Sequence, residues 1–432
     1  MSKVKKEKNT AGDLIEFIWN SPSVFHVVDN IKTKLLQQDV QELKEREVWK
    51  IEGGKGYFVV RNDSSVIAFR TPKKEAKGFH VIASHSDAPT FKVKEKPELV
   101  AEEHYIRLNT EKYGGMIQSS WLDRPLSVAG RVFIREDGQK PIAKLVNVDK
   151  DLLVIPNLAI HMNHDINKGY EYNPQVDLLP LMALGNKETA NDLLLQTVAE
   201  AAKVKKEDIL TGDLFLYVRE KGRLTGVQEE FVLSPRLDDL QCVHAALEAF
   251  AKAKPHQYIN VMAVFDNEEV GSTTAQGADS TFWKDTLERI GESLGWNTQE
   301  KCCKLAESFL ISADNAHAVH PNHPEKADPA NRPYLGGGLV IKYHGGQKYT
   351  TDGMSAACMK LWCEAAKVPY QTFYNRSDMV GGSTLGNISN AQVSMTSVDV
   401  GLPQLAMHSA MEMAAGADSV AAMKVFERFY GE

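Results

Sequence analysis

Residues 259–266, INVMAVFD, contain the pattern that decides the fold, a short apolar run that stops abruptly at an acidic residue. Two further segments share this pattern of an apolar run that leads to a histidine or an aspartate: 79–85 (FHVIASH) and 309–314 (FLISAD). Such runs are typical of buried strands in an α/β sheet. Because active sites in these sheets gather at the carboxyl ends of strands, we expect the three polar ends to lie close together.

Helical periodicity follows the strand patterns. In the segment 238–252, apolar residues recur at intervals of three and four, which predicts an amphipathic helix. We predict two further helices at 355–367 and 409–430. Strands that alternate with helices in this way indicate an α/β fold.

The pattern changes between residues 91 and 231, where short alternating runs such as 143–148 are separated by turn residues. One helical stretch lies near 193–203. A chain of 432 residues is also longer than a single core usually allows. We therefore predict an α/β domain formed by 1–90 and 232–432, with a largely β domain inserted at 91–231.

The composition excludes several classes of protein. With 43% hydrophobic and 25% charged residues, the chain has the make-up of an ordinary globular protein. The net charge of −7 is modest, and the basic residues form no long block, so we expect no nucleic-acid partner. No apolar run approaches the roughly 20 residues of a membrane-spanning helix.

The amino-terminal residues and the cysteines indicate the cellular compartment. The lysines among the first eight residues are followed by polar residues instead of an apolar stretch, which argues against a signal peptide. The five cysteines are odd in number and lack zinc-finger spacing, which fits a reducing compartment. We predict a cytoplasmic protein that does not associate with a membrane.

Acidic residues and histidines cluster at the predicted strand ends and turns, where they are candidate metal ligands. The candidates are His85, Asp87, Asp238, Asp239, Glu268, Glu269, Asp314 and His408. A divalent ion lowers the pKa of bound water from about 16 towards 7, and two ions roughly 3.5–4 Å apart can also polarise a scissile carbonyl. Such a pair needs one bridging carboxylate with further His and carboxylate ligands on each side, and the sequence contains this set.

Each candidate also has a simpler interpretation. Asp238 follows a proline and could cap the amino end of a helix, which is a frequent use of aspartate. Adjacent glutamates such as Glu268 and Glu269 usually form a solvated surface. His317 and His320 follow a candidate ligand closely and could replace it, although we expect them to line a pocket or to be structural.

The resemblance to a known family extends over most of the chain. Six segments carry it, in the family's order: IASHSDAPTFKVK (82–94), SPRLDDL (234–240), FDNEEVGS (265–272), SADNAHAVHPNHP (312–324), SDMVGGSTLG (377–386) and VDVGLPQLAMHS (398–409). They resemble the M18, aspartyl aminopeptidase-like family. This resemblance implies a mixed-sheet two-metal peptidase domain with helices on both faces, and an inserted, barrel-like β domain that mediates dimerisation and closes over the site.

The same resemblance implies the metal ligands, position by position. His85 and Asp314 hold one ion, and Glu269 and His408 hold the other. Asp238 bridges the two. The ions are expected to be two Zn²⁺ per subunit, although Co²⁺ or Mn²⁺ suits the same ligands.

Further roles follow from the family positions. Glu268 is the general base, which takes a proton from water and returns it to the leaving amine. Independently of the family, Asp87 lies two residues after His85 and is well placed to accept the second N–H of that histidine. His161, in the segment IPNLAIHMN, corresponds to a histidine that stabilises the reacting carbonyl oxygen and can come from a neighbouring subunit. Lys342 corresponds to a family position near the substrate pocket, where a cation could pair with an acidic side chain. His317, which follows Asp314 closely, is expected to line the same pocket.

Two positions depart from the family. Asp239 stands where many members have Asn, and Asn267 stands where His is more usual. Neither residue replaces a ligand, but an extra acid could change metal preference or disfavour acidic substrates. The segment TTDGMSA at 350–356 also differs from the one expected in eukaryotic aspartyl-specific members, which leaves the choice between acidic and neutral N-terminal residues open.

The predicted activity is removal of single N-terminal residues, acidic or neutral such as Leu, from peptide substrates by a homo-oligomer, expected to be a dodecamer built from dimers. A two-metal carboxypeptidase or N-acyl amino acid deacylase is the main alternative within enzymes. An arginine that clamps a substrate carboxylate would favour this alternative, with Arg236 and Arg376 as candidates. A non-catalytic oligomeric scaffold is the alternative outside enzymes.

Overall fold

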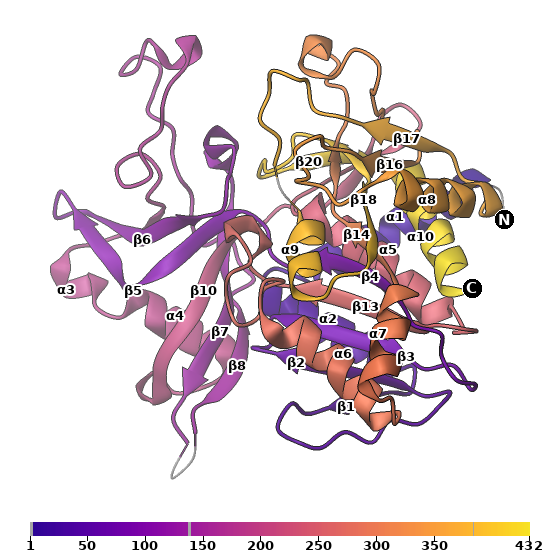
Figure 1. Cartoon of the computed structure of the whole chain (residues 1–432). Helices are drawn as coiled ribbons and strands as arrows, with labels where there is room; N and C mark the ends of the chain where they lie inside the picture. Colours follow the sequence, from indigo (N-terminus) through magenta and orange to yellow (C-terminus); the bar gives the residue numbers. More distant parts are fainter. Residues whose placement is uncertain (1–2, 137–139, 383) are drawn as a thin grey trace.

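The computed structural model describes residues 3–136, 140–382 and 384–432, and Figure 1 shows two sheet regions side by side. The described helices are α1 (Lys3–Trp19), α2 (Val24–Leu36), α3 (Lys187–Ala190), α4 (Leu193–Ala202), α5 (Leu237–Lys252), α6 (Thr281–Ser293), α7 (Thr298–Ala306), α8 (Gly353–Ala365), α9 (Leu385–Gln392) and α10 (Gly416–Tyr430). None of them is both long and apolar enough to cross a membrane.

The larger sheet has nine strands and both parallel and antiparallel pairs. In sheet order they are β1 (Val40–Leu43), β2 (Gly56–Arg61), β3 (Ser65–Arg70), β13 (Ile259–Phe265), β4 (Phe79–His85), β14 (Phe309–Ala313), β18 (Thr396–Gly401), β16 (Leu339–Lys342) and β17 (Tyr370–Phe373). The central strands β13, β4, β14 and β18 are mutually parallel, so their carboxyl ends share one edge. The predicted α/β fold and its three buried strands are confirmed.

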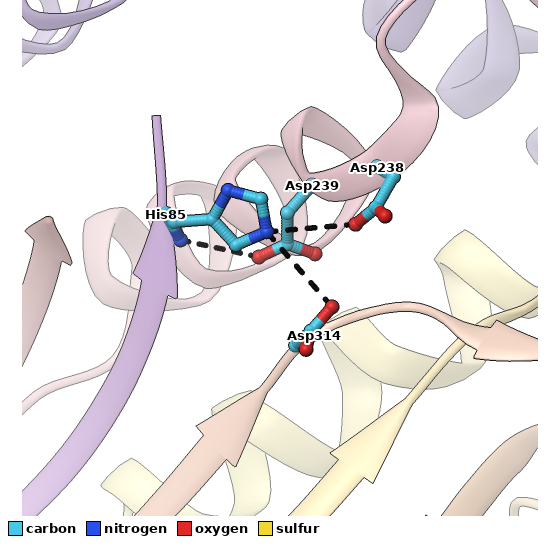
Figure 2. Close-up of side chains that lie close together, drawn as sticks. All are labelled: His85, Asp238, Asp239 and Asp314. Atoms are coloured by element: carbon cyan, nitrogen blue, oxygen red, sulfur yellow. Dashed lines mark hydrogen bonds and ion pairs between the residues drawn. The ribbon is translucent and has the colours of Figure 1, made fainter. Parts of the chain in front are cut away.

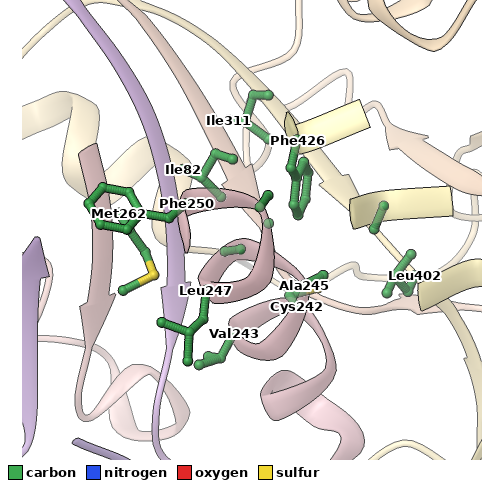
Figure 3. Close-up of a cluster of buried hydrophobic side chains, with 14 of the residues drawn as sticks. Ile82, Cys242, Val243, Ala245, Leu247, Phe250, Met262, Ile311, Leu402 and Phe426 are labelled. Carbon is green, nitrogen blue, oxygen red and sulfur yellow. The ribbon is translucent and has the colours of Figure 1, made fainter. Parts of the chain in front are cut away.

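Helices cover both faces of this sheet, because alternate residues of each strand point to opposite sides. Ile82 of β4 faces a core to which α1, α2, α5, α8 and α10 contribute, and Figure 3 shows part of this core. The adjacent residue Val81 faces a second core, which residues of α6 and α9 help to form. Both faces of the central strands are therefore apolar, which explains their near-continuous hydrophobic runs.

The second sheet has six antiparallel strands and lies beside the first (Figure 1). In order they are β8 (Ile142–Asn147), β7 (Leu126–Ile134), β10 (Ile209–Val218), β5 (Thr90–Ala101), β6 (Tyr105–Tyr113) and β9 (Leu181–Leu184). Its apolar face packs against α4 in a core of its own. Closure of this unit into a barrel, its role in dimerisation and the predicted domain boundaries remain predictions.

A third sheet has five strands, and one of them occupies the first part of the segment predicted as the last helix. Its strands are β11 (Arg223–Thr225), β12 (Phe231–Ser234), β20 (Glu412–Ala415), β19 (Pro403–Leu405) and β15 (Ala316–His317). Residues 409–415 were predicted to be helical, but α10 begins only at Gly416. The segment before it pairs with β12 and β19, and this long-range pairing overrides local helical preference.

Candidate metal centre

Five potential ligands meet at the carboxyl edge of the central strands. His85 is the last residue of β4, and Asp314 directly follows β14. Asp238 lies in the irregular first turn of α5, Glu269 lies in a 3₁₀ turn after β13, and His408 lies in the loop after β19. Figure 2 shows His85, Asp238 and Asp314 turned toward one another. The parallel pairing of β13, β4 and β14 is what brings these distant segments together.

The ligand atoms form two groups that share one carboxylate. The Nε2 atom of His85 lies 3.5 Å from Oδ1 of Asp238 and 3.9 Å from Oδ1 of Asp314. The Nε2 atom of His408 lies 3.3 Å from Oδ2 of Asp238 and 3.4 Å from Oε1 of Glu269. Around a tetrahedral ion with ligands at about 2.1 Å, ligand atoms are roughly 3.4 Å apart. Both groups therefore have the spacing of a metal site.

Asp239 also belongs to the first group, the one around His85, although the sequence analysis did not assign Asp239 to either ion. One atom each from Asp239, His85, Asp238 and Asp314 lie within 4.8 Å of one another. Oδ2 of Asp239 accepts a hydrogen bond from the backbone N–H of His85 at 3.2 Å (Figure 2). The peptide bond between Asp238 and Asp239 is cis.

Buried oxygens without a partner indicate that the site suits cations. Oδ1 of Asp238, Oδ1 of Asp239 and Oε1 of Glu269 are buried and accept no hydrogen bond from any residue that the structure describes. A buried acceptor without a partner is costly, by about 1–3 kcal/mol for each group. Divalent cations would bind these oxygens, so the residues of this site fit the predicted zinc ions.

The charges support the same conclusion. Burial, reinforced by the carboxylate of Asp238, raises the pKa of Glu269 well above its usual range. Burial likewise raises the pKa of Asp239 well above its usual range. Burial opposes ionisation of Asp238 as well, but the imidazoles of His408 and His85 beside its carboxylate hold its pKa low. The protein alone thus leaves an excess of buried acid, which divalent cations would compensate.

Glu268 lies next to the two groups with a carboxyl group poised between its acid and base forms. Burial, together with nearby Asp314 and Asp87, raises the pKa of Glu268 to about 8. Its carboxylate also lies within 4.8 Å of ligand atoms of His85 and Glu269. The geometry by itself therefore permits Glu268 to act either as a base or as a ligand.

Asp87 connects the histidine ligand to the two glutamates. Its Oδ1 lies 3.3 Å from Nδ1 of His85 and accepts the backbone N–H of Glu268 at 3.1 Å. Its Oδ2 accepts the backbone N–H of Glu269 at 3.2 Å. Asp87 therefore lies beside the imidazole, but the hydrogen-bond partner of Nδ1 is its backbone oxygen at 3.1 Å, while its carboxylate fixes the glutamate turn.

Tyr113 is a neighbour that sequence analysis missed. Its hydroxyl donates to Oδ2 of Asp87 at 2.7 Å and accepts from Nδ2 of Asn267 at 2.9 Å. Burial, with Asp87 nearby, raises the pKa of Tyr113, so the hydroxyl stays protonated as a donor. Tyr113 ends β6 of the six-stranded sheet, and no local pattern marks it.

The remaining predicted site residues lie outside the ligand groups. Lys342 is only 2% exposed, and its Nζ donates to the backbone oxygens of Asp314 at 2.7 Å and Asn315 at 3.3 Å. His317 is exposed in β15. His161 is exposed in a turn of the segment between β8 and β9, which Figure 1 shows projecting from the molecule. Their roles remain predictions.

The structure disagrees with the simpler interpretations of Asp238 and Glu269. Asp238 is not the residue that caps α5, because the N-cap position is Arg236, and the carboxylate of Asp238 is turned to the two histidines. The side chain of Glu269 is only 4% exposed, which excludes a solvated surface for it. Arg376, a candidate carboxylate clamp, already pairs with Asp378 at 2.7 Å.

Comparison with known proteins agrees with this site. The family model of the M18 aminopeptidase I zinc metalloproteases matches residues 17–430. A probable M18 family aminopeptidase 2 of Clostridium novyi is 49% identical over 431 residues, which cover 99% of this chain and 100% of that protein. Aspartyl aminopeptidase 1 of Schizosaccharomyces pombe is 38% identical over 455 residues, which cover 98% of this chain and 95% of that protein.

A solved structure shows the same fold. The mApe1 dodecamer of S. cerevisiae superposes with a TM-score of 0.84 at 26% identity, and the match covers 97% of this chain and 96% of that one. The resemblance read from the sequence segments is therefore confirmed over nearly the whole chain. This chain belongs to the M18 family of zinc metalloaminopeptidases, which remove N-terminal residues.

Proposed function

We propose that this M18 aminopeptidase acts with two zinc ions per subunit. His85 and Asp314 would hold one ion, and Glu269 and His408 the other. The observation that carries the proposal is the bridging geometry of Asp238, which presents Oδ1 to His85 at 3.5 Å and Oδ2 to His408 at 3.3 Å. A single-ion site would not need two histidines on opposite oxygens of one carboxylate.

The chain's own residues then perform the proton transfers. A pair of divalent ions bound there would supply an activated water and polarise the scissile carbonyl. Glu268 would take the proton of the attacking water and return it to the leaving amine, which requires a pKa near the working range. Burial raises the pKa of Glu268 to about 8 in the metal-free chain, and cations bound beside it would lower this pKa, which would make the carboxylate available as a base. Asp87 orients His85 and holds the turn of both glutamates.

The substrate is proposed to be the free amino end of a peptide, with an acidic residue or a neutral one such as Leu in first position. A carboxypeptidase or deacylase needs an arginine free to bind a carboxylate. Arg376 is engaged by Asp378, whereas Arg236 lines the same pocket as Asp238 and His408, where its Nη2 donates to the backbone oxygen of Ile18 at 2.9 Å. The name of the S. pombe relative favours acidic residues. Lys342 adds little to that argument, because Asp314 and Asn315 already accept from its Nζ.

Assembly is the second part of the proposal. The yeast relative is a dodecamer, and we propose the same assembly, built from dimers, for this chain. His161, exposed on the projecting segment, would then reach the site of a neighbouring subunit and stabilise the reacting carbonyl oxygen. The six-stranded sheet, within the proposed inserted domain at 91–231, is the surface proposed for dimerisation. All five cysteines are free thiols, which fits the cytoplasm as the proposed location.

A zinc titration of the metal-free protein tests the two-ion proposal. We expect two tightly bound ions per chain in the wild type and one in each of the variants His85→Ala and His408→Ala. The variant Asp238→Ala should lose both, because each group depends on this carboxylate. One ion per chain in the wild type, or two ions in Asp238→Ala, would exclude the bridged arrangement.

A further inference from the structure

Glu412 lies behind the metal centre and bonds to the backbones of two proposed ligands. Its Oε2 accepts the N–H of Asp238 at 3.0 Å, and its Oε1 accepts the N–H of His408 at 2.6 Å. The side chain is 2% exposed. Nothing in the sequence marked this residue, since it falls in the part of the predicted helix that is a strand.

The two ligand segments need such support because their backbones are irregular. Asp238 has φ −80° and ψ 110°, which are not helical, although the residue lies within the first turn of α5. His408 has φ 65°, in the left-handed region that residues other than glycine seldom adopt. Neither backbone is therefore fixed by the regular hydrogen bonds of a helix or a strand. One buried carboxylate bonds to both, from the start of β20.

The same support continues to the ligand segment after β14. Nε2 of Gln404 approaches Oε1 of Glu412 at 3.5 Å, and Oε1 of Gln404 accepts from Nδ2 of Asn315 at 2.7 Å. Asn315 follows Asp314 directly, and its Nδ2 also donates to the backbone oxygen of Leu237 at 3.0 Å. Gln404 and Asn315 are both buried. A continuous polar network thus links the segments that carry three of the proposed ligands.

We propose that Glu412 is a positioning residue that sets the relative placement of Asp238 and His408. Through this placement it sets the affinity of the site for its second ion, the more weakly bound of the two. This inference rests on the proposed two-ion function. Outer partners of metal ligands commonly contribute 10–100-fold to metal affinity. Here the contribution would come through the backbone of the ligands, because Glu412 bonds to their N–H groups and not to their side chains.

The chain contains a matched control for an ordinary structural carboxylate. Asp418 is likewise fully buried and accepts two backbone N–H groups, those of Gly336 and Gly338, both at 2.8 Å. These partners are not metal ligands. If Glu412 merely stabilised the fold, the variants Glu412→Gln and Asp418→Asn would have the same effects.

The test is a zinc titration of the full-length protein and both variants, with Co²⁺ absorption as a second readout of coordination geometry. An amide at position 412 keeps one acceptor but turns an NH₂ group toward the other N–H. We expect Glu412→Gln to bind the weaker ion 10–100-fold less tightly and to alter the Co²⁺ spectrum. Asp418→Asn should keep both affinities within about twofold, although its thermal stability falls.

Wild-type affinities and an unchanged Co²⁺ spectrum in Glu412→Gln would overturn the proposal. If Glu412→Gln does not fold, Glu412→Asp replaces it, because the carboxyl group is kept but retreats by one C–C bond, about 1.5 Å. Weaker binding of the second ion is then expected, and unchanged binding again contradicts the inference. A wild-type protein that binds one ion would instead refute the two-ion function itself, so the two failures are distinguishable.

Discussion

Replacing Glu268 by Gln separates the two roles that the geometry permits for this side chain. The carboxylate lies close enough to His85 and Glu269 to be a ligand, yet neither group built around Asp238 needs it. If Glu268 is the base, Glu268→Gln retains two ions and loses turnover. The adjacent variant Glu269→Gln is the matched control, because it should lose an ion instead.

The expected loss can be estimated from the surroundings of Glu268. A positioned general base contributes about 10²–10⁴-fold to the rate, or roughly 3–5 kcal/mol of transition-state stabilisation. Asp87 is the nearby carboxylate that could substitute, but it already accepts hydrogen bonds from Tyr113 and from the backbones of Glu268 and Glu269. We therefore expect the upper half of the range, with kcat at least about 10³-fold lower.

The assay is steady-state hydrolysis of a peptide with a free amino end, with metal content measured on the same samples by mass spectrometry. Two ions per chain with a fall in kcat of that size is the predicted result. A variant Glu268→Gln that retains more than a tenth of wild-type kcat would refute the base assignment. A variant that loses one ion would show that Glu268 is a ligand.

Three further predictions concern residues outside the ligand groups. Tyr113→Phe removes a 2.7 Å hydrogen bond to Asp87. It should lower the free energy of unfolding measured in urea by about 1.5–3 kcal/mol and the zinc affinity by about 10-fold. Unchanged zinc affinity would contradict the link through Asp87. Burial lowers the pKa of His80 from 6.5 to about 4 in the folded chain. Between these pH values the unfolded chain binds a proton that the folded chain does not bind. The stability that neutral His80 contributes is therefore complete above pH 6.5 and is lost as the pH falls to 4. Urea unfolding at pH 4.5 and 7.5 should show a smaller acid loss in His80→Leu than in the wild type, by up to about 3 kcal/mol, and equal losses would exclude this origin. His161→Phe should lower kcat at least about 10-fold with metal content and melting temperature unchanged, while His164→Phe, also exposed in that segment, should retain wild-type kcat; equal effects would exclude a special role for His161.

The predictable part of the site is the part that local sequence determines. The apolar runs that end at His85 and Asp314 form the predicted strands β4 and β14, and parallel pairing brings the two ends to one edge. The helix that begins near Asp238 is likewise visible in the periodicity of α5. Which candidate binds which ion was implied by the family resemblance and remains a prediction. One group around Asp238 consists of Asp238, Glu269 and His408, and the other contains Asp239 in addition to His85, Asp238 and Asp314.

The part that could not be predicted depends on long-range pairing. Glu412 was expected in a helix, and only the pairing of β20 with β12 and β19 makes it a strand residue aimed at the backbones of Asp238 and His408. Tyr113 comes from the six-stranded sheet and meets Asp87 only because the two sheets lie side by side. Neither contact leaves a pattern in neighbouring residues, so only a three-dimensional structure reveals them.

The most direct test of the two-ion aminopeptidase account is the release of the first residue from matched peptides, followed by mass spectrometry. The set carries Asp, Glu, Leu or Met in first position, each with a free or an acetylated amino end, before and after metal removal and zinc restoration. We predict release only from free amino ends, loss of release on chelation, and recovery when zinc reaches two equivalents per chain. Cleavage of the acetylated peptides or of their carboxyl ends, or full activity at one zinc per chain, would contradict the account.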